Sequence, residues 1–453
     1  MKTLLLFASV MILLASCAER KNDNISSNVI DIESSMQNVA KLKVSDFGNS
    51  IRYIPLETTD DCLIDDRAIV KVLKDYIVIE SNQICYLFDK KDGKFISTIG
   101  HRGQDPEAYS SNTSFTDEKE EYLYFLKQPD NLIKYDMTGK FSGKITFPVP
   151  PGLASYYLLT DNEIITYHSG INSSYNFTLA FHDKTGALKD TTDLLLPAQQ
   201  ETISDIMDVS VIKGSDIFGC RAGTGAVIIN YRNDNKLIIA PNAATLWNHA
   251  GNVRFKENFI DTVYNISNGI LTPYITFNTG SLNWPANERT SKNNNNKRVF
   301  ISYVSENNSF VFFQCITGLY TDEHVLYNGL FNKKTGETKL SKNSDGIQDD
   351  MSGFMTFKPN AMSTAGELVS MVDAVTVMEW VEKNPESKDN AKLSFLKDYN
   401  GIHLIIKIFE EAELRVIFRF RIFFNPLHYG NGINKRNKFS GSAHCFWFER
   451  HKA

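Results

Sequence analysis

A repeat with a period of 47 residues constrains the fold of this chain more than any other feature. Each copy has an apolar strand-like segment, a turn that begins with Asp and contains Gly, and a second strand-like segment. The copies run from Tyr86 to Phe95, from Ile133 to Phe141 and from Leu179 to Leu188, with a degenerate copy from Leu330 to Glu337. The turn residues Asp89, Asp136 and Asp183 follow one another at intervals of 47 residues.

The repeated unit predicts a β-hairpin. Asp caps the turn with its own side chain, and Gly takes the positive-φ position that ends the turn. Apolar residues alternate on either side, which is the pattern of half-buried strands. A period of this length suits a four-stranded antiparallel blade, and such blades pack radially because none can bury both faces alone. We therefore expect an all-β fold, a β-propeller.

Further strand-like segments bring the expected number of blades to six. The inner strands of the first three blades are expected at Lys71–Glu80, Glu121–Leu126 and Asn162–Tyr167. The last three units are expected over Asp205–Gly280, over Arg298–Lys342, and at Phe354–Phe357 together with Gly401–Phe409. Helix is expected only at Met371–Lys383 and Asn390–Lys397.

Composition excludes several classes of protein. Hydrophobic residues make up 42% of the chain and aromatic residues 12%, enough for a large core, and the formal net charge of −5 argues against a nucleic-acid partner. The cysteines other than Cys17 are scattered and show no CxxC or Cys/His spacing, so we expect no metal and no cofactor. Isolated buried thiols are the simplest reading of them, and one incidental disulfide is the alternative.

The N-terminus has the pattern of a secretion signal that ends in a lipid-acceptor cysteine. Lys2 precedes an apolar run from Leu4 to Leu14, which is too short for a spanning helix, and Ala15-Ser16 stand directly before Cys17. This pattern resembles the lipobox of bacterial lipoproteins. The resemblance implies a signal peptide over residues 1–16 and lipidation of Cys17. Residues 18–27 are polar and show no strand or helix periodicity, so we expect a flexible tether over residues 17–40.

Three stretches carry a resemblance to a known family. They are Ile51–Thr59, Phe88–Tyr109 and Phe259–Tyr264, the last followed by Leu271–Tyr274. The chain resembles the six-bladed, NHL-like β-propeller lipoproteins of gut anaerobes that degrade glycans, and it departs from their pattern at Asp105 and Ala108. The resemblance implies that a strand near residues 51–56 completes the last blade beside C-terminal strands, so that the N- and C-terminal strands close the ring.

We expect the propeller to span residues 41–410. Residues 411–453 are basic and rich in Phe, and they have no counterpart in the family. A membrane-contacting extension and an aberrant C-terminus are both compatible with this composition, and we expect a poorly ordered tail.

The densest polar cluster follows the first repeat hairpin, at His101–Glu107. Arg102, Gln104 and Glu107 are candidate ligand-binding residues at one rim of the ring, although a structural tie between blades is the reading that we favour for Arg102 and Glu107. Trp247 and Trp284 are candidates for stacking on a sugar ring. Most aromatic residues of a propeller instead belong to the core between blades.

No catalytic motif is present, so we assign no catalytic residue and favour a binding function over an enzymatic one. The expected function is a lipid-anchored module of the cell envelope that binds a glycan or protein ligand in nutrient capture, with an outer-membrane transporter complex as a further partner. The alternatives are a propeller hydrolase or lyase acting on sugars and a scaffold of an envelope complex. A monomer on the outer membrane is expected, and the periplasmic and surface-facing orientations are both left open.

Overall fold

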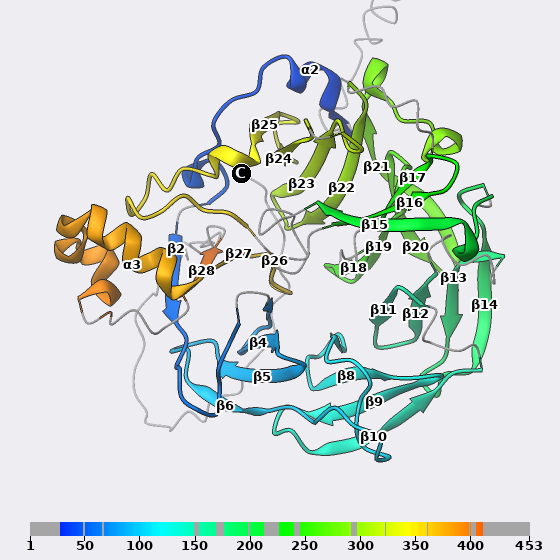
Figure 1. The fold of residues 1–453 in the computed structure, drawn as a ribbon, viewed down its shortest axis with the longest axis horizontal. Helices are drawn as coiled ribbons and strands as arrows, with labels where there is room; N and C mark the ends of the chain where they lie inside the picture. Colours follow the sequence, from blue (N-terminus) through cyan, green and yellow to red (C-terminus); the bar gives the residue numbers. More distant parts are fainter. Residues whose placement is uncertain are drawn as a thin grey trace, which may run out of the picture. The chain divides into compact units, whose positions relative to one another are not determined.

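The structure is a computed structural model. It describes residues 28–48, 50–65, 68–148, 154–168, 176–197, 200–212, 226–239, 245–290, 297–321, 323–359, 361–397, 399 and 405–410. Within these ranges the chain has an all-β fold, in which most strands belong to four-stranded antiparallel sheets (Figure 1). The predicted fold class is therefore confirmed at this level.

The first three sheets are meanders, in which each strand pairs with the next along the chain. Sheet 1 contains β3 (Ile69–Val72), β4 (Tyr76–Ser81), β5 (Ile84–Asp89) and β6 (Phe95–Thr98). Sheet 2 contains β7 (Ser114–Thr116), β8 (Tyr122–Lys127), β9 (Asn131–Asp136) and β10 (Phe141–Thr146). Sheet 3 contains β11 (Tyr156–Leu159), β12 (Ile164–Tyr167), β13 (Phe177–His182) and β14 (Leu188–Asp193).

The second half of the chain adds three more four-stranded meanders or their equivalents. Sheet 4 contains β18 (Leu246–His249), β19 (Asn252–Lys256), β20 (Thr262–Ser267) and β21 (Ile270–Asn278), with β1 (Val29–Asp31) added in parallel to β21. Sheet 5 contains β22 (Val299–Glu306), β23 (Phe310–Thr317), β24 (Val325–Asn332) and β25 (Thr338–Lys342). Sheet 6 contains β26 (Ala361–Met362), β27 (Leu368–Val372), β28 (Ile405–Glu410) and β2 (Ser50–Pro55).

A seventh, three-stranded sheet stands apart from this series among the described residues. This side sheet contains β15 (Ile206–Ile212), β16 (Ala226–Tyr231) and β17 (Lys236–Ile239). It packs through Ile228 and Ile238 on Phe300 and Ile316 of sheet 5. The fourth unit predicted over residues 205–280 therefore divides into the side sheet and sheet 4.

Hydrophobic clusters join each four-stranded sheet to the next. Phe125 of sheet 2 packs in one cluster with Leu87 of sheet 1, and Ile164 of sheet 3 packs with Leu132 of sheet 2. Corresponding clusters join sheets 3 and 4, sheets 4 and 5, and sheets 5 and 6. A further cluster packs Ile406 of sheet 6 against Ile77 of sheet 1. The six sheets thus succeed one another around a common centre (Figure 1).

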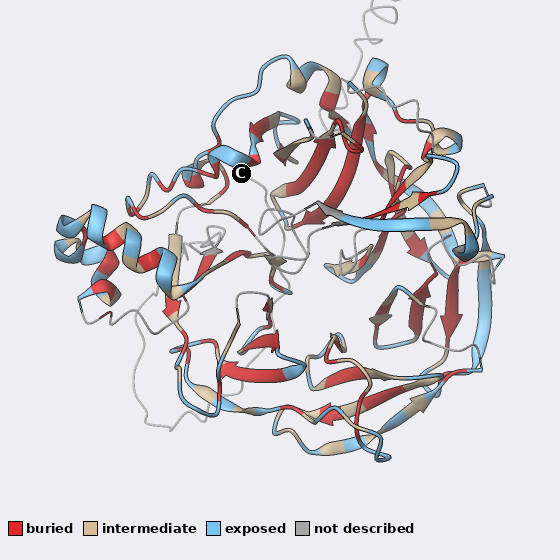
Figure 2. Cartoon of the chain, in the orientation of Figure 1, coloured by how far each residue is buried: buried red, intermediate tan, exposed pale blue. Residues whose placement is uncertain are grey.

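Burial follows the position of a strand within its sheet. In sheet 3 the middle strands β12 and β13 are buried, whereas the outer strand β14 is exposed along its length (Figure 2). Middle strands contact the neighbouring sheets on both faces, which explains the long apolar runs of β23 and β12. Outer strands need no such runs.

The repeated turns have the structure that the sequence predicts. The carboxylates of Asp89, Asp136 and Asp183 accept hydrogen bonds from the main-chain N–H two residues later, at Lys91, Thr138 and Thr185, with lengths of 2.6, 2.9 and 2.8 Å. Gly93, Gly139 and Gly186 have φ values of 74°, 83° and 94°. The degenerate copy behaves alike, because Asn332 accepts from the main chain of Lys334 and Thr335.

Several element boundaries differ from the prediction. Lys71–Glu80 is not one strand, because a turn at Lys74 and Asp75 divides it into β3 and β4. Phe354–Phe357 forms no strand, and Phe357 makes only an isolated bridge to Ile347. Residues 29–36, predicted as tether, instead form β1 and the short helix α2 (Ile32–Met36).

Helix α3 (Ala374–Lys383) and the 3-10 helix over residues 391–396 pack beside sheet 6. Helix α3 begins within the predicted segment at the N-cap Asp373, whose side chain accepts from Thr376 N at 2.8 Å. The segment predicted at residues 390–397 is a 3-10 helix, Ala391–Leu396. The other 3-10 helices among the described residues are Val44–Asp46, Ile203–Asp205, Gly280–Leu282, Ala286–Glu288, Asn343–Asp345 and Pro385–Asp389. In the described part of the chain no helix is long and apolar enough to cross a membrane.

Candidate functional site

A cavity of about 1420 Å³ lies where the first strands of the six four-stranded sheets converge. Its lining includes residues of β3, β7, β11, β18, β22 and β26, the strand that stands at one edge of each sheet. Among the residues that the structure describes, the side sheet provides no lining residue. Propeller-like folds place their central channel where innermost strands meet, and this cavity occupies the corresponding place. Its volume exceeds that of most small-molecule sites.

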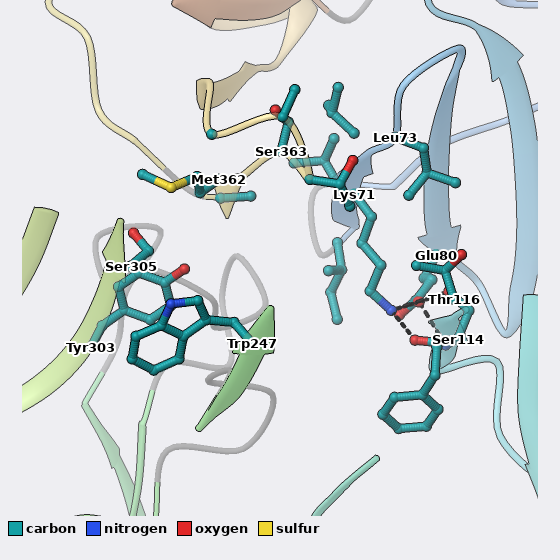
Figure 3. Close-up of a pocket in the computed structure, with 18 of the residues that line it drawn as sticks. Lys71, Leu73, Glu80, Ser114, Thr116, Trp247, Tyr303, Ser305, Met362 and Ser363 are labelled. Carbon is teal, nitrogen blue, oxygen red and sulfur yellow. Dashed lines mark hydrogen bonds and ion pairs between the residues drawn. The ribbon is translucent and has the colours of Figure 1, made fainter. Parts of the chain in front are cut away.

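One wall of the cavity is aromatic. Trp247 of β18 lies beside Tyr303 of β22, and Tyr156 of β11 belongs to the same lining (Figure 3). Burial raises the pKa of the Tyr156 hydroxyl to about 12, and burial also raises the pKa of Tyr303 above its ordinary value. Both hydroxyls therefore stay protonated near neutral pH. The indole N–H of Trp247 is buried and has no hydrogen-bond partner among the described residues.

The opposite wall carries an ion pair in which Glu80 is buried and Lys71 is partly exposed. Lys71 of β3 donates to the Oε1 atom of Glu80 of β4, and Ser114 of β7 donates to the same atom through its N–H and its hydroxyl, both at 2.7 Å (Figure 3). Lys71 also donates to the main-chain oxygen of Ser114. The triad joins sheets 1 and 2. The second oxygen of Glu80, Oε2, is buried and accepts no hydrogen bond from the described residues.

A second buried charge network lies at the contact between sheets 4 and 5. Glu306, at the end of β22, accepts from Arg254 Nε at 2.7 Å and from the Tyr274 hydroxyl at 2.9 Å, and it also pairs with Lys333. Arg254 stacks over the Tyr274 ring at 3.8 Å from the ring centroid. Burial alone would raise the pKa of Glu306, but Lys333 and Arg254 outweigh it and hold the pKa below its ordinary value.

Further carboxylates lie around the turn that follows β7. Asp117 accepts from the main chain of Glu121 at 2.9 Å, and Glu120 accepts from the main-chain N–H of Lys74 at 2.7 Å. Glu118 accepts from Asn248 of sheet 4 at 2.8 Å. These contacts link sheets 1, 2 and 4 at the edge of the cavity, and they keep three negative charges in its lining.

The polar cluster predicted at His101–Glu107 is not part of this cavity. Arg102, Gln104 and Glu107 lie exposed in the loop between β6 and β7, and none of them is a lining residue. The loop is fixed by Asp105, which pairs with His101 at 2.7 Å. It is also fixed by the main-chain oxygen of Glu107, which accepts from the hydroxyl of Tyr135.

The structure separates the two predicted tryptophans. Trp247 lies in strand β18 and lines the cavity. Trp284 is a core residue, 4% exposed, which packs on Phe259 and Tyr320 and donates its indole N–H to the main-chain oxygen of Glu288 at 3.1 Å. This burial favours a core role for Trp284, and ligand binding by Trp284 stays a prediction.

Sequence reasoning missed Lys71, Glu80, Ser114 and Tyr303. Each lies within or beside an apolar strand and belongs to no motif. The available signal was the presence of charges at both ends of the apolar segment from Lys71 to Glu80, where a half-buried strand ordinarily carries few.

The cysteines and potential metal ligands give no further site in the described ranges. Cys62, Cys85 and Cys315 are free and buried, as predicted for isolated thiols. No group of three His, Cys, Asp or Glu residues is placed to hold a metal ion in the part of the chain that the structure describes. Cys17, with its predicted lipidation, and the tail predicted at 411–453 lie outside the described residues.

Fold and cavity together define an all-β protein with a propeller-like arrangement of sheets around a large central cavity. The chain belongs to the family described as a domain of unknown function, DUF4934, which matches residues 27–401. A search of curated proteins finds no match. Of the expected resemblance to NHL-like lipoproteins, the propeller-like fold is supported, and the family shown is DUF4934.

Two solved structures illustrate what the chain is similar to. A candidate exported protein from Bacteroides fragilis is 14% identical, with a TM-score of 0.57, over 85% of this chain and 99% of that chain. A member of the DUF4221 family from Bacteroides vulgatus is 12% identical, with a TM-score of 0.38, over 80% of this chain and 97% of that chain. Because the sequence identity is so low, the similarity to the Bacteroides fragilis protein shows a shared fold and nothing about function.

Proposed function

We propose that this protein is a lipid-anchored, extracytoplasmic six-bladed β-propeller that binds a ligand in its central cavity. The observation that carries the proposal is the cavity itself, to which the first strand of every four-stranded sheet contributes. Ligand sites occur preferentially where several elements converge in this way, with a few polar groups placed on a largely apolar wall.

Strand pairing supports closure of six blades into a ring. Strand β2 pairs with β28 in antiparallel register from Ser50 opposite Glu410 to Pro55 opposite Ile405. The last sheet is therefore built from both ends of the fold. Such mixing removes a free sheet edge, which would otherwise be open to pairing with another chain. The side sheet is then an addition to the ring rather than a seventh blade.

The N-terminal pattern supports the anchoring. Lys2, the apolar run from Leu4 to Leu14 and the small residues before Cys17 together form a lipoprotein signal. Several acyl chains on Cys17 would hold the protein stably on a bilayer, where one chain would not. The location that follows is the cell envelope, on the outer membrane.

The two walls of the cavity support a glycan as the ligand. The aromatic ring of Trp247, with Tyr303 beside it, provides stacking surface, and Tyr156 provides a hydroxyl for hydrogen bonding. Residues with this combination bind sugars through ring faces and hydroxyls at once. We propose that this binding serves nutrient capture, with an outer-membrane transporter as the partner.

An enzyme acting on sugars is the second candidate, because carboxylates line the same cavity. Acid–base catalysis by two carboxylates requires one that donates a proton near the working pH. Glu306 cannot serve as this acid, because Lys333 and Arg254 hold its pKa low. Glu80 is tied to Lys71 and Ser114. The ion pairs and hydrogen bonds of these two carboxylates favour ligand binding over catalysis.

The proposal is tested with the mature chain from residue 18 on an array of glycans. We expect binding that Trp247→Ala abolishes and that Trp380→Ala leaves intact. Trp380 is a matched control because it is half-buried in α3, makes an edge-to-face contact with the Phe354 ring and does not line the cavity. Shortened oligosaccharides in the mixture would instead support the enzyme. Equal binding by the two variants would contradict the cavity as the site.

The anchor is tested separately on the full chain. Labelling of cells with a radioactive fatty acid should mark the protein, and Cys17→Ser should abolish both the label and recovery in the membrane fraction. Retention of the label in Cys17→Ser would contradict lipidation at this residue. Co-purification of a membrane partner without glycan binding would favour a scaffold.

A further inference from the structure

Strand β1 attaches the start of the described chain to the circumference of the six sheets. It pairs in parallel with β21, from Val29 opposite Thr276 to Asp31 opposite Asn278. Strand β21 ends the series of strands that begins with β18 at the central cavity, so β1 extends the outer edge of sheet 4. The described chain therefore enters the fold at this outer edge, away from the cavity.

Buried contacts hold β1 and α2 in place. Ile30 and Ile32 are both 0% exposed and pack in one hydrophobic cluster with Phe277 of β21. Glu33 accepts hydrogen bonds from the main-chain N–H and the hydroxyl of Ser281, at 2.9 and 2.6 Å. Release of β1 and α2 would return two isoleucine side chains to water, which the hydrophobic effect opposes. The chain is thus held at β1 rather than being free up to residue 40.

The segment between Cys17 and Val29 is short. Val29 stands 12 residues after Cys17. A chain of this length spans at most about 43 Å, even when it is fully extended. Acyl chains on Cys17 would therefore hold Val29 within about 43 Å of the bilayer, whatever conformation the segment adopts.

The fold is wider than this segment is long. A compact chain of about 380 residues, such as residues 28–410, has a radius of gyration of about 21 Å, which for a sphere gives a width of about 54 Å. Sheets 1 and 4 are three places apart around the common centre, so their outer edges lie on opposite sides of the fold (Figure 1). With the outer edge of sheet 1 on the bilayer, Val29 would lie about 50 Å above it, beyond the reach of the segment.

We infer that this protein meets the lipid bilayer with the outer edge of sheet 4, where β1 joins β21, and holds the outer edge of sheet 1 away from it. The inference rests on the proposed lipidation of Cys17, to which it adds an orientation. The short segment permits orientations in which sheet 4 is nearest to the bilayer, and it forbids the inverted one. The outer edge of sheet 1 then stays open to partners in the surrounding medium.

Two exposed isoleucines offer matched positions for a probe. Ile270 begins β21 and is 64% exposed, and Ile96 lies in β6, the outer strand of sheet 1, and is 43% exposed. A fluorescent amino acid replaces one or the other in the full, lipidated chain. The chain is placed in vesicles of phosphatidylethanolamine and phosphatidylglycerol that carry an acceptor dye on some headgroups. We expect stronger energy transfer to the dye from position 270 than from position 96.

Two changes to the chain test the cause. Insertion of about 30 Gly and Ser residues between Arg20 and Lys21 raises the reach to roughly 140 Å, more than the width of the fold, so transfer from position 96 should rise towards that from position 270. Ile30→Asp should have the same effect, because a carboxylate in this buried position opposes the docking of β1 and lengthens the free segment. Val29→Asp is the matched control, since Val29 is 43% exposed in the same strand, and it should leave the difference intact.

The outcomes separate the orientation from the anchor on which it rests. Equal transfer from the two positions, or stronger transfer from position 96, would overturn the orientation and leave lipidation intact. A chain that is not recovered with the vesicles would contradict both. A difference between the positions that the insertion leaves unchanged would overturn the short segment as its cause.

Discussion

The buried network around Glu306 permits a quantitative prediction. Arg254→Met removes the guanidinium that donates to Glu306 Oε1 at 2.7 Å and that stacks over Tyr274. Arg254 and Glu306 are 5% and 4% exposed. Breaking a buried pair by removing one partner costs about 3–5 kcal/mol, because the other charge stays buried. Lys333 remains beside Glu306, so we expect the lower end, about 3 kcal/mol.

The assay is urea unfolding at pH 7, followed by tryptophan fluorescence. Lys94→Met is the matched control, because Lys94 and Asp92 form a surface pair at 3.5 Å with side chains 74% and 45% exposed. Such pairs contribute about 0–1 kcal/mol, so this variant should resemble the parent. Raising the salt concentration should leave the loss in Arg254→Met almost unchanged, since buried charges are screened little.

A double-mutant cycle shows whether the loss belongs to the pair. Glu306→Gln should reduce the cost of Arg254→Met, and a coupling of about 1.5 kcal/mol or more is expected for groups in direct contact. Additive losses within about 0.5 kcal/mol would refute the reasoning. So would an Arg254→Met variant as stable as Lys94→Met.

Three further predictions concern glycines, a histidine and the thiols. Gly186→Ala should destabilise the protein by about 2 kcal/mol more than Gly336→Ala in urea unfolding. Both glycines have positive φ, but only at Gly186 would an added Cβ meet a main-chain oxygen, at 2.3 Å. Equal losses of stability would contradict this. Burial lowers the pKa of His168 to about 4 from 6.5, so the folded state binds fewer protons between these values. Stability should therefore be full above pH 6.5 and fall as the pH drops towards 4, and His168→Gln should flatten this dependence if the imidazole causes it. Burial raises the pKa of the Cys85 and Cys315 thiols, which makes them unreactive in the folded protein. Peptide mass spectrometry should find both unmodified after treatment of the native protein with iodoacetamide at pH 8, and alkylated after the same treatment in urea. Alkylation in the native protein would argue against their burial.

The sequence predicts the hairpins well because their determinants are local. The side chain of Asp136 and the positive φ of Gly139 act within a few residues, so the pattern alone identifies the turn. The division of the segment at residues 205–280 depends instead on which sheet each strand joins. That choice is made by contacts such as Ile238 with Phe300, which are far apart in the chain.

The candidate site was predicted less well for the same reason. Trp247 was recognised by its residue type, whereas Trp284 has the same type and lies in the core. Glu80 and Ser114 become neighbours only when sheet 2 packs on sheet 1. A cavity formed by six strands has no linear signature, because each strand contributes a few residues whose apolar pattern also serves the core.

The pairing of β2 with β28 has a consequence for the order of folding. Ser50 and Glu410 are partners although about 360 residues separate them, so their contact closes a very long loop. Loop-closure entropy makes such contacts slow to form, and proteins that depend on them fold slowly. Sheet 6 cannot be completed until almost all of the described chain has left the ribosome. A nascent chain of this kind remains incompletely folded throughout synthesis, a state compatible with threading through a narrow translocation channel.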